Sequence, residues 1–300
     1  MVGRFAPSPS GRMHLGNVFS ALLAWLSVKH EHGEMVLRIE DLDPDRCRPE
    51  YAQTLKEDLR WLGLHWDREQ TPQSRRDAAY GEVFEALRAK NLVYPCYCTR
   101  TELHAASAPH ASDGRVLYAG TCRNLTEAEK AQKTKAPAWR LIVPDRDVEF
   151  TDGLQGAYRE NLAADCGDFI VRRADGVYAY QLAVVTDDAE GGVTQVVRGM
   201  DLLSSTPRQL YLYELMGKTP PEFYHVPLLV APDGRRLSKR EKDLDLGALR
   251  KQMTAEALLG YLANLAGLIE KETPISAAEL AAVFDWKNVK KDPIVIEPSP

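Results

Sequence analysis

Short strand-like segments alternate with longer amphipathic helices through the first 90 residues, and this alternation limits the possible folds more than any other feature. Residues 1–7 and the apolar run Met35–Ile39 have the length of strands, whereas residues 17–30 place apolar side chains at helical spacing. Further helices are predicted to begin at Pro49 and to lie around Tyr80–Leu87. This order favours an α/β protein with a parallel sheet, whose ligands bind outside the carboxyl ends of the strands.

Two polar segments follow the first two predicted strands and should therefore meet at that edge. The loop Pro7–Gly11 precedes a helix start, and Glu40 follows the second strand. Unpaired N–H groups at a helix start suit phosphate, to which His14 and Asn17 can add donors, while Gly16 leaves room for a flat base. Taken alone, the same residues are more typical of a strand–loop–helix corner with an exposed histidine.

The second half of the chain carries further strand and turn signals. The dipeptide Asp175-Gly176 is typical of a hairpin turn, and Thr206-Pro207 is typical of a helix start with Thr206 as its cap. The helical tail 254–284 precedes an end, 293–300, that we expect to fray. Strands are predicted at 138–143, 169–173, 177–184, 193–197 and 226–231.

A basic loop, Arg236-Leu237-Ser238-Lys239-Arg240, comes directly after the turn Pro232-Asp233-Gly234. Such a loop can clamp pyrophosphate as charge builds up in a transition state. Seen alone, it is more typical of a solvated hairpin tip. The formal net charge is −5, which weakly disfavours a nucleic-acid-binding protein, although basic side chains do cluster here and at 130–135.

The segment 96–137 differs from its surroundings and is interpreted as an insertion. It holds three cysteines, spaced as Cys96-x-Cys98 with Cys122 further on. Three thiolates suit a structural zinc ion, which takes four nitrogen or sulfur ligands. From the residues alone, the fourth ligand is His104 or His110, and buried thiols without metal are the alternative.

Other features exclude whole classes of protein. Residues 1–12 lack the apolar stretch of a secretory signal, and no run is long enough to span a membrane. An odd number of cysteines, five, without an export signal indicates reduced thiols, so Cys47 and Cys166 are expected to be ordinary. We therefore expect a cytoplasmic protein that does not contact a membrane.

Two motifs together are more specific than either alone. His14-Leu15-Gly16-Asn17 resembles the HIGH motif, and Arg236–Arg240 resembles the KMSKS motif, of class I aminoacyl-tRNA synthetases. Asn17 replaces the final histidine and Arg236-Leu237 replaces Lys-Met, but asparagine still donates hydrogen bonds and Lys239 is retained. Three further segments resemble the glutamyl branch of that class: Arg4–Gly11, Leu37–Asp43 and Val196–Leu203.

The resemblance implies a Rossmann-like class I synthetase catalytic domain, of the HIGH-type nucleotidyl transferase fold. It also implies a zinc-binding insertion and a small α-helical C-terminal part. Residues 1–95 and 138–240 would form the two halves of the catalytic domain, the second with the KMSKS-like loop. The insertion would be 96–137, and 241–300 would be a helical segment without an anticodon-binding domain.

The resemblance also assigns a site. Two carboxylates and one ammonium need cations and one anion, and the planar fork of arginine suits a carboxylate. Arg4 is expected to bind the side-chain carboxylate and Glu40 the ammonium. The implied glutamate-binding residues are Arg4, Phe5, Ala6, Pro7, Ser8, Glu40, Tyr180 and Arg198. The implied ATP-binding residues are His14, Gly16, Asn17, Leu237, Ser238 and Lys239, with His14, Asn17 and Lys239 catalytic.

The chain length and the cysteine pattern most resemble the family of glutamyl-queuosine tRNA(Asp) synthetases. That family implies one structural Zn²⁺ held by Cys96, Cys98, Cys122 and the oxygen of Tyr118. It implies activation of L-glutamate by ATP with Mg²⁺, without tRNA, to glutamyl-AMP. The glutamyl group would then pass to the cyclopentene-diol of queuosine at the wobble position of tRNA(Asp), whose anticodon stem-loop binds to what we expect is a monomer.

Three alternatives stay open at this point. The chain could be a truncated glutamyl-tRNA synthetase that charges the 3′ end of tRNA(Glu). It could be a non-catalytic, zinc-bearing RNA-binding paralogue, although both nucleotide motifs look intact. It could also be a small nucleotidyltransferase that shares only the His-x-Gly motif.

Overall fold

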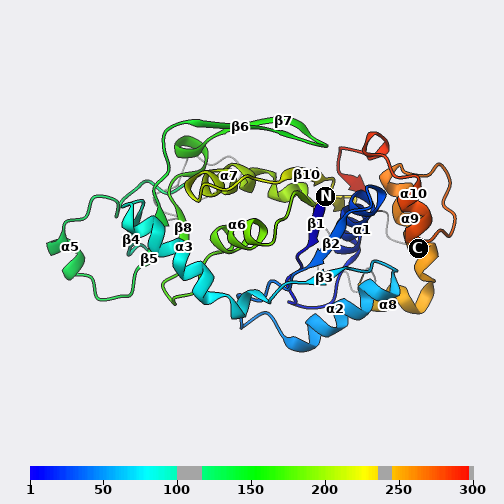
Figure 1. Ribbon diagram of the computed structural model, residues 1–300, viewed down its shortest axis with the longest axis horizontal. Coiled ribbons are helices and arrows are strands. Elements are labelled where there is room, and N and C mark those ends of the chain that lie inside the picture. The colour runs from blue at the N-terminus through cyan, green and yellow to red at the C-terminus, as the bar shows by residue number, and fades with distance from the viewer. Residues whose placement is uncertain (100–116, 236–244, 297–300) are drawn as a thin grey trace.

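A parallel sheet of five strands forms the centre of the computed structural model, which describes residues 1–99, 117–235 and 245–296 (Figure 1). The strands are β1 (Val2–Phe5), β2 (Glu34–Leu37), β3 (Arg68–Glu69), β9 (Gln195–Gly199) and β10 (Glu222–Val226). Their order is β10–β9–β1–β2–β3, and adjacent strands run parallel. The predicted parallel sheet is confirmed. Its strand order reverses between β1 and β9, which is where ligands of such sheets bind.

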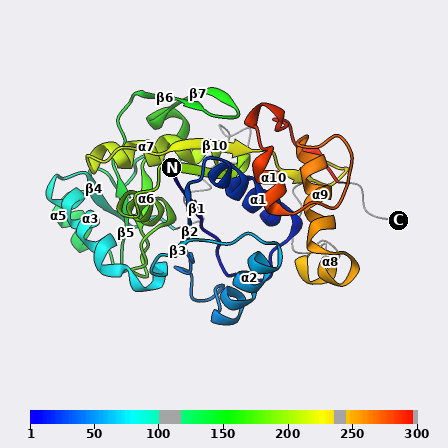
Figure 2. The ribbon, with the colours of Figure 1, turned by 45° about the vertical axis from the view of Figure 1, so that its right-hand side comes forward.

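The helix α1 (Leu15–His30) is buried on most sides because it lies between the sheet and the C-terminal helices (Figure 2). It packs on β1, β9 and α10 (Ala277–Ala282). Lys29 and His30 stand in its last turn, where positive charge favours the negative end of the helix dipole. The predicted helix is confirmed, although its cap is Glu31 and not Gly33.

Most of the other predicted helices are confirmed. Pro49 lies in the first turn of its helix, as expected, but the cap before Thr206 is Ser205, so Thr206 is itself helical. The helical tail is two helices, because Gly267 at φ 90° ends the first. The remaining helices are α2 (Pro49–Trp61), α3 (Asp77–Ala89), α5 (Glu127–Ala131), α6 (Tyr180–Glu190), α7 (Thr206–Leu215), α8 (Leu246–Gln252) and α9 (Ala255–Ala266). Short helical turns span Gln73–Arg75, Leu162–Cys166, Met200–Ser205 and Trp286–Asn288.

The strand predicted at 177–184 is wrong. The turn at Asp175-Gly176 does form, and Arg172 bridges to Tyr178, but the chain enters helix α6 at Tyr180. The run Leu182–Val185 is apolar because α6 is buried there. Periodicity cannot distinguish a buried strand from a buried helix when both faces are apolar.

The strand predicted at 226–231 is divided. Residues up to Val226 belong to β10, and after Pro227 the short β11 (Leu229–Val230) pairs instead with β12 (Ile294–Val295). Five strands escaped prediction. The sequence does not predict the short β3, and β12 contradicts the expected fraying from residue 293, because Ile294 and Val295 pair with β11. Two more form the hairpin of β6 (Asp147–Asp152) and β7 (Gly156–Asn161). The fifth, β4 (Val93–Cys96), joins β5 (Ala138–Leu141) and β8 (Phe169–Arg172) in an antiparallel sheet.

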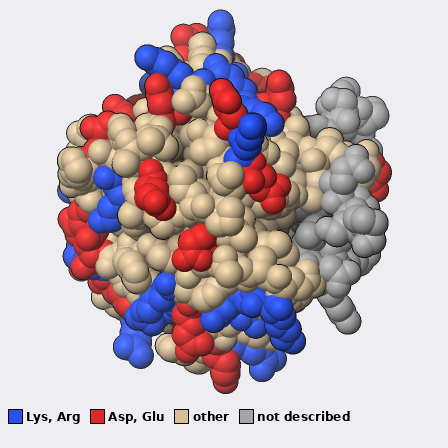
Figure 3. All heavy atoms as spheres, turned by 90° about the vertical axis from the view of Figure 1, so that its right-hand side faces the viewer, with Lys and Arg blue, Asp and Glu red and all other residues tan. Residues whose placement is uncertain are grey.

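The elements are arranged along one long axis (Figure 1). The antiparallel sheet and α5 form one end, the parallel sheet is central, and α8, α9 and α10 form the other end. On the face over these C-terminal helices, acidic and basic side chains are intermixed around the rim (Figure 3). Among the described residues, none of the helices has the length and apolar character needed to cross a bilayer.

Candidate functional site

A cavity of about 530 Å³ opens at the carboxyl end of β1 and β9, and its size is typical of small-ligand sites. It is lined by residues from the start of the chain, from the end of β2, from α6 and from β9. Eleven residues with predicted roles line it: Arg4, Phe5, Ala6, Pro7, Ser8, His14, Gly16, Asn17, Glu40, Tyr180 and Arg198. The predicted ATP-binding residues Leu237, Ser238 and Lys239 lie outside the described residues.

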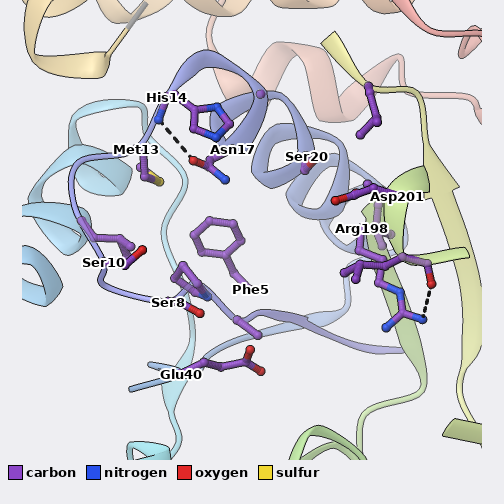
Figure 4. Close-up of a pocket in the computed structure, with 18 of the residues that line it drawn as sticks. Phe5, Ser8, Ser10, Met13, His14, Asn17, Ser20, Glu40, Arg198 and Asp201 are labelled. Atoms are coloured by element: carbon purple, nitrogen blue, oxygen red, sulfur yellow. Dashed lines mark hydrogen bonds between the residues drawn. The ribbon is translucent and has the colours of Figure 1, made fainter. Parts of the chain in front are cut away.

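The side chains divide between two ends of the cavity (Figure 4). His14 and Asn17 lie at one end, at the start of α1, whereas Glu40 and Arg198 lie toward the other, with Phe5 and Ser8 between them. His14 caps α1, and its backbone N–H donates to the Asn17 side-chain oxygen at 3.2 Å. A Cβ atom at Gly16 would lie 3.2 Å from the His14 ring, which is a tight contact, so glycine at this position gives the imidazole room.

The chain that follows the basic loop is placed beside His14 by backbone contacts. Asp245, the first described residue after the loop, forms a bridge with His14, and the Leu246 N–H donates to the Met13 carbonyl at 2.9 Å. The fully buried carboxylate of Asp58 reinforces this contact, since it accepts from both Arg12 and Arg250, at 3.0 and 2.7 Å. The first described residues after the basic loop therefore lie at the His14 end of the cavity.

At the opposite end, Glu40 and Arg4 belong to a buried ion-pair network. Glu40 accepts from Arg38 at 3.0 Å, and Arg38 also binds Asp188 at 2.6 Å. Arg4 donates to Asp188 at 3.4 Å. Burial raises the pKa of the Glu40 carboxyl despite the nearby Arg38 and Arg4. Burial also pushes the pKa of Asp188 upward, but Arg38 and Arg4 outweigh it and hold that pKa below the ordinary value.

Arg198 is the most firmly held of the predicted ligands. Its Nε donates to His225 at 2.9 Å, its Nη1 to Gln209 at 2.8 Å, and its Nη2 to Thr206 at 2.8 Å. A longer contact of 3.4 Å runs from Nη2 to the Leu202 carbonyl. Burial lowers the pKa of this guanidinium. Its orientation is thus set by the protein before any ligand binds.

Tyr180 reaches the cavity from the first residue of α6 and not from a strand, and burial raises the pKa of its hydroxyl. Sequence reasoning missed the supporting residues Arg38, Asp188, His225 and Asp152. A signal for Asp188 was available, because the two adjacent acids Asp187-Asp188 come just after the apolar run at 182–185, and acids are seldom buried without a partner.

The three cysteines of the insertion lie together near the antiparallel sheet. The sulfurs of Cys96, Cys98 and Cys122 are all within 4.8 Å of one another. The Tyr118 hydroxyl lies 3.5 Å from the Cys96 sulfur and 3.9 Å from the Cys98 sulfur, and Cys98 and Cys122 are 3.6 Å apart. Both His104 and His110 lie outside the described residues.

These distances fit a tetrahedral ion. With Zn–S bonds of about 2.3 Å and a Zn–O bond of about 2.0 Å, two sulfurs lie roughly 3.8 Å apart, and a sulfur and an oxygen roughly 3.5 Å apart. Arg140 donates to the Cys96 sulfur at 3.2 Å, and the Tyr97 N–H donates to the Cys122 sulfur at 3.4 Å, contacts that stabilise thiolates. The Cys96–Cys98–Cys122 cluster can therefore bind a metal ion.

Comparisons with known proteins agree with this geometry. Residues 1–297 match the family model for tRNA synthetases class I (E and Q), catalytic domain. The glutamyl-Q tRNA(Asp) synthetase of Nitratidesulfovibrio vulgaris is 48% identical, over 98% of this chain and 94% of the relative. The enzyme of the same name from Symbiobacterium thermophilum is 46% identical, over 99% and 96% of the two chains.

Solved structures of longer synthetases share the fold. The glutamate tRNA ligase of Elizabethkingia meningosepticum, in complex with its amino acid, superposes with a TM-score of 0.83 at 30% identity. The glutamate-tRNA synthetase of Elizabethkingia anophelis gives 0.84 at 30% identity. Nearly the whole of this chain is covered, 98% and 99%, but it spans only 66% and 68% of those two chains.

Proposed function

The chain belongs to the class I tRNA synthetases of the glutamate and glutamine group, among the glutamyl-Q tRNA(Asp) synthetases, and on this basis we propose its reaction and its site. It activates L-glutamate with ATP, without tRNA, to glutamyl-AMP. It then transfers the glutamyl group to the cyclopentene-diol of queuosine at the wobble position of tRNA(Asp). The observation that best supports this is the meeting of eleven predicted ligands in one cavity at the reversal of strand order.

In the proposed first step, glutamate binds at the Arg198 end of the cavity. Arg4 takes the side-chain carboxylate and Glu40 takes the ammonium, with Tyr180, Ser8 and the backbone of Phe5–Pro7 completing the wall. An oxygen of the α-carboxylate attacks the α-phosphorus of ATP, and the bond to the β-phosphate oxygen breaks to release pyrophosphate. No side-chain nucleophile is required, because the reaction is accelerated by positioning the two substrates and by stabilising the charge that develops on the phosphates.

The nucleotide lies at the His14 end. The amino end of α1, with His14, Gly16 and Asn17, binds the phosphates and the base, and Leu237, Ser238 and Lys239 are the further ATP-binding residues. The contact between His14 and Asp245, the first described residue after Lys239, supports this assignment. Bound to ATP, Mg²⁺ supplies further positive charge for the phosphate oxygens.

In the second step, a hydroxyl of the queuosine diol attacks the carbonyl carbon of glutamyl-AMP, and AMP leaves. The anticodon stem-loop offers the unstacked base that this requires. We propose that the enzyme acts as a monomer. Because its acceptor is a tRNA, we place the enzyme in the cytoplasm.

The insertion is proposed to hold one structural Zn²⁺ through Cys96, Cys98, Tyr118 and Cys122. Four protein ligands leave no open position, which is the arrangement of structural rather than catalytic zinc. The ion would join the start of segment 96–137, at Cys96 and Cys98, to its middle, at Tyr118 and Cys122. Its chemistry would be confined to fixing these ligands in place.

The experiment that tests this function is a transfer assay with labelled glutamate. Queuosine-containing tRNA(Asp) should be labelled, whereas tRNA(Asp) with unmodified guanosine and tRNA(Glu) should not. Queuosine-containing tRNA(Asp) that lacks its 3′-terminal adenosine should still accept label. Label on tRNA(Glu) alone, lost with its terminal adenosine, would instead identify a truncated glutamyl-tRNA synthetase.

A further inference from the structure

A buried histidine that the proposed chemistry does not use holds Arg198 in place. His225 lies on β10, the strand next to β9, and its side chain is fully buried. Its Nε2 is 2.9 Å from Arg198 Nε, and its Nδ1 is 2.6 Å from the Oδ2 of Asp152. Asp152 is the last residue of β6, so a chain of contacts runs from the β6–β7 hairpin to the cavity wall.

The donors in this chain fix the tautomer of the imidazole. An arginine Nε–H can only donate, so Nε2 of His225 must accept. The ring proton therefore lies on Nδ1 and is donated to Asp152. In a protonated imidazole, the N–H at Nε2 would face the N–H at Nε of Arg198, and neither could accept a hydrogen bond. Burial lowers the pKa of His225, in keeping with a neutral ring.

The Asp152 carboxylate is itself locked. Its Oδ1 accepts from the backbone N–H groups of Leu154, Gln155 and His225, at 3.0, 2.9 and 3.1 Å. This leaves only Oδ2 for the His225 ring. The two oxygens thus have separate roles: Oδ1 stabilises the turn after β6, and Oδ2 orients the His225 imidazole.

The tip of the hairpin is pressed onto β10 at the same place. The Gly153 N–H donates to the Phe223 carbonyl at 2.8 Å, and the Gln155 side chain donates to the His225 carbonyl at 2.8 Å. A Cβ atom at Gly153 would lie 2.2 Å from the Tyr224 ring, so only glycine permits this approach. The hairpin therefore cannot shift without moving Asp152 relative to His225.

We propose that Asp152 and His225 are positioning residues that present Arg198 to a carboxylate of the amino-acid substrate. This makes the β6–β7 hairpin part of the machinery for amino-acid recognition, although neither residue lines the cavity. The inference rests on the proposed function, because it assigns the Arg198 end of the cavity to glutamate.

Asp152→Asn is the sharpest test because the structure dictates how the new amide lies. Three backbone donors require an oxygen at the Oδ1 position, so the amide nitrogen must face His225 Nδ1. That nitrogen donates, the ring proton moves to Nε2, and two N–H groups then face each other across 2.9 Å. Arg198 has to turn away, with little change in volume or backbone.

The readout is glutamate-dependent ATP–pyrophosphate exchange by the full chain. Asp152→Asn should raise the KM for glutamate about tenfold or more, the effect expected when a buried donor loses its acceptor, and should leave the KM for ATP unchanged. Asp147→Asn is the matched control, since it makes the same substitution in the same hairpin at an exposed side chain whose carboxylate pairs with the exposed Arg159. Intact mass should confirm that the new asparagine, which directly precedes Gly153, has not deamidated.

Substitutions of His225 separate positioning from general stability. Gln keeps an oxygen for Arg198 and an N–H for Asp152, so His225→Gln should stay within about threefold of the wild-type KM for glutamate, whereas His225→Leu should resemble Asp152→Asn. The inference is overturned if Asp152→Asn keeps the wild-type KM for glutamate, or if the KM values for glutamate and ATP rise together with a lower Tm. Absence of exchange in the wild type would instead refute the proposed function.

Discussion

The amino-acid end of the cavity and the cysteine cluster are both built from buried polar side chains, but those side chains find partners in opposite ways. At the amino-acid end, Arg198 and Glu40 are bound by protein groups from distant segments, such as His225 and Arg38. In the cluster, the three thiols and the Tyr118 hydroxyl contact one another within residues 96–122. The first region holds its shape before a ligand arrives, and the second has the geometry that a cation completes.

This difference indicates which substitutions should impair each region. A preorganised pocket fails when a remote support is removed, since its ligands lose their orientation. A metal-completed cluster fails when one ligand is lost, and it fails locally. Substitutions in the two regions should therefore have separable consequences, one in substrate binding and the other in metal content.

The largest effect should come from the nucleotide end, which adjoins the preorganised region without belonging to it. Lys239→Ala should slow activation about 100-fold or more, because a cation that stabilises the transition state is removed. Glutamate affinity, measured by calorimetry, should change little. A matching loss of glutamate affinity would break the separation between the two ends of the cavity.

Arg198→Ala removes one of the side chains that form the preorganised amino-acid end of the cavity. Loss of one partner of a buried charge pair costs about 2 kcal/mol or more, so glutamate should bind roughly thirtyfold more weakly. ATP binding should be unchanged. Arg159→Ala, at an exposed arginine of β7, is the control and should bind glutamate normally. Unchanged glutamate affinity in Arg198→Ala would refute the pocket assignment.

Tyr118→Phe tests the cysteine cluster, the second of the two regions compared. Without the phenolic oxygen, zinc should be released about tenfold or more readily to a chelator, while the KM for glutamate stays near the wild-type value. Tyr94→Phe is the matched control, since Tyr94 is buried in the same small core but its hydroxyl binds Asp168. Intact zinc in Tyr118→Phe would return attention to His104 or His110 as the fourth ligand.

The smallest effect concerns pH. Burial raises the pKa of Glu40 above its usual 4.5, so on acidification Glu40 loses its charge, and with it the substrate ammonium, sooner than an ordinary glutamate would. Glutamate binding should weaken as the pH falls through that raised pKa. Glu40→Gln should bind glutamate roughly fivefold more weakly at neutral pH and should lack this part of the pH dependence. Identical pH profiles for the two proteins would remove Glu40 from the ammonium site.

The sequence predicts the cavity better than it predicts the structures that support it. The strand–helix order of the first 90 residues leads to the parallel sheet, and the loop and Glu40 follow its strand ends as expected. The segment 177–184 shows where this reasoning stops, because an apolar run in a buried helix has no polar face to reveal its period. Tyr180 still lines the cavity, because the family resemblance and not the predicted strand pointed to it.

The supporting residues could not be inferred because their partners are far away in the sequence. His225 and Asp152 belong to neighbouring strands of different sheets, and the β6–β7 hairpin has few buried side chains to mark it as structured. By contrast, the cysteine cluster is local, and its spacing alone indicates a metal site. A site whose residues lie close together in the sequence can be predicted from it, whereas a contact between distant segments becomes known only once the fold is determined.

The central claim is that the cavity binds a dicarboxylic amino acid next to ATP. It is tested most directly by ATP–pyrophosphate exchange in the absence of tRNA, with glutamate, aspartate and glutamine compared at equal concentrations. The account predicts exchange with glutamate and much less with the other two, since only glutamate presents two carboxylates at the required spacing. No exchange with any of them, or equal exchange with glutamine, would contradict it.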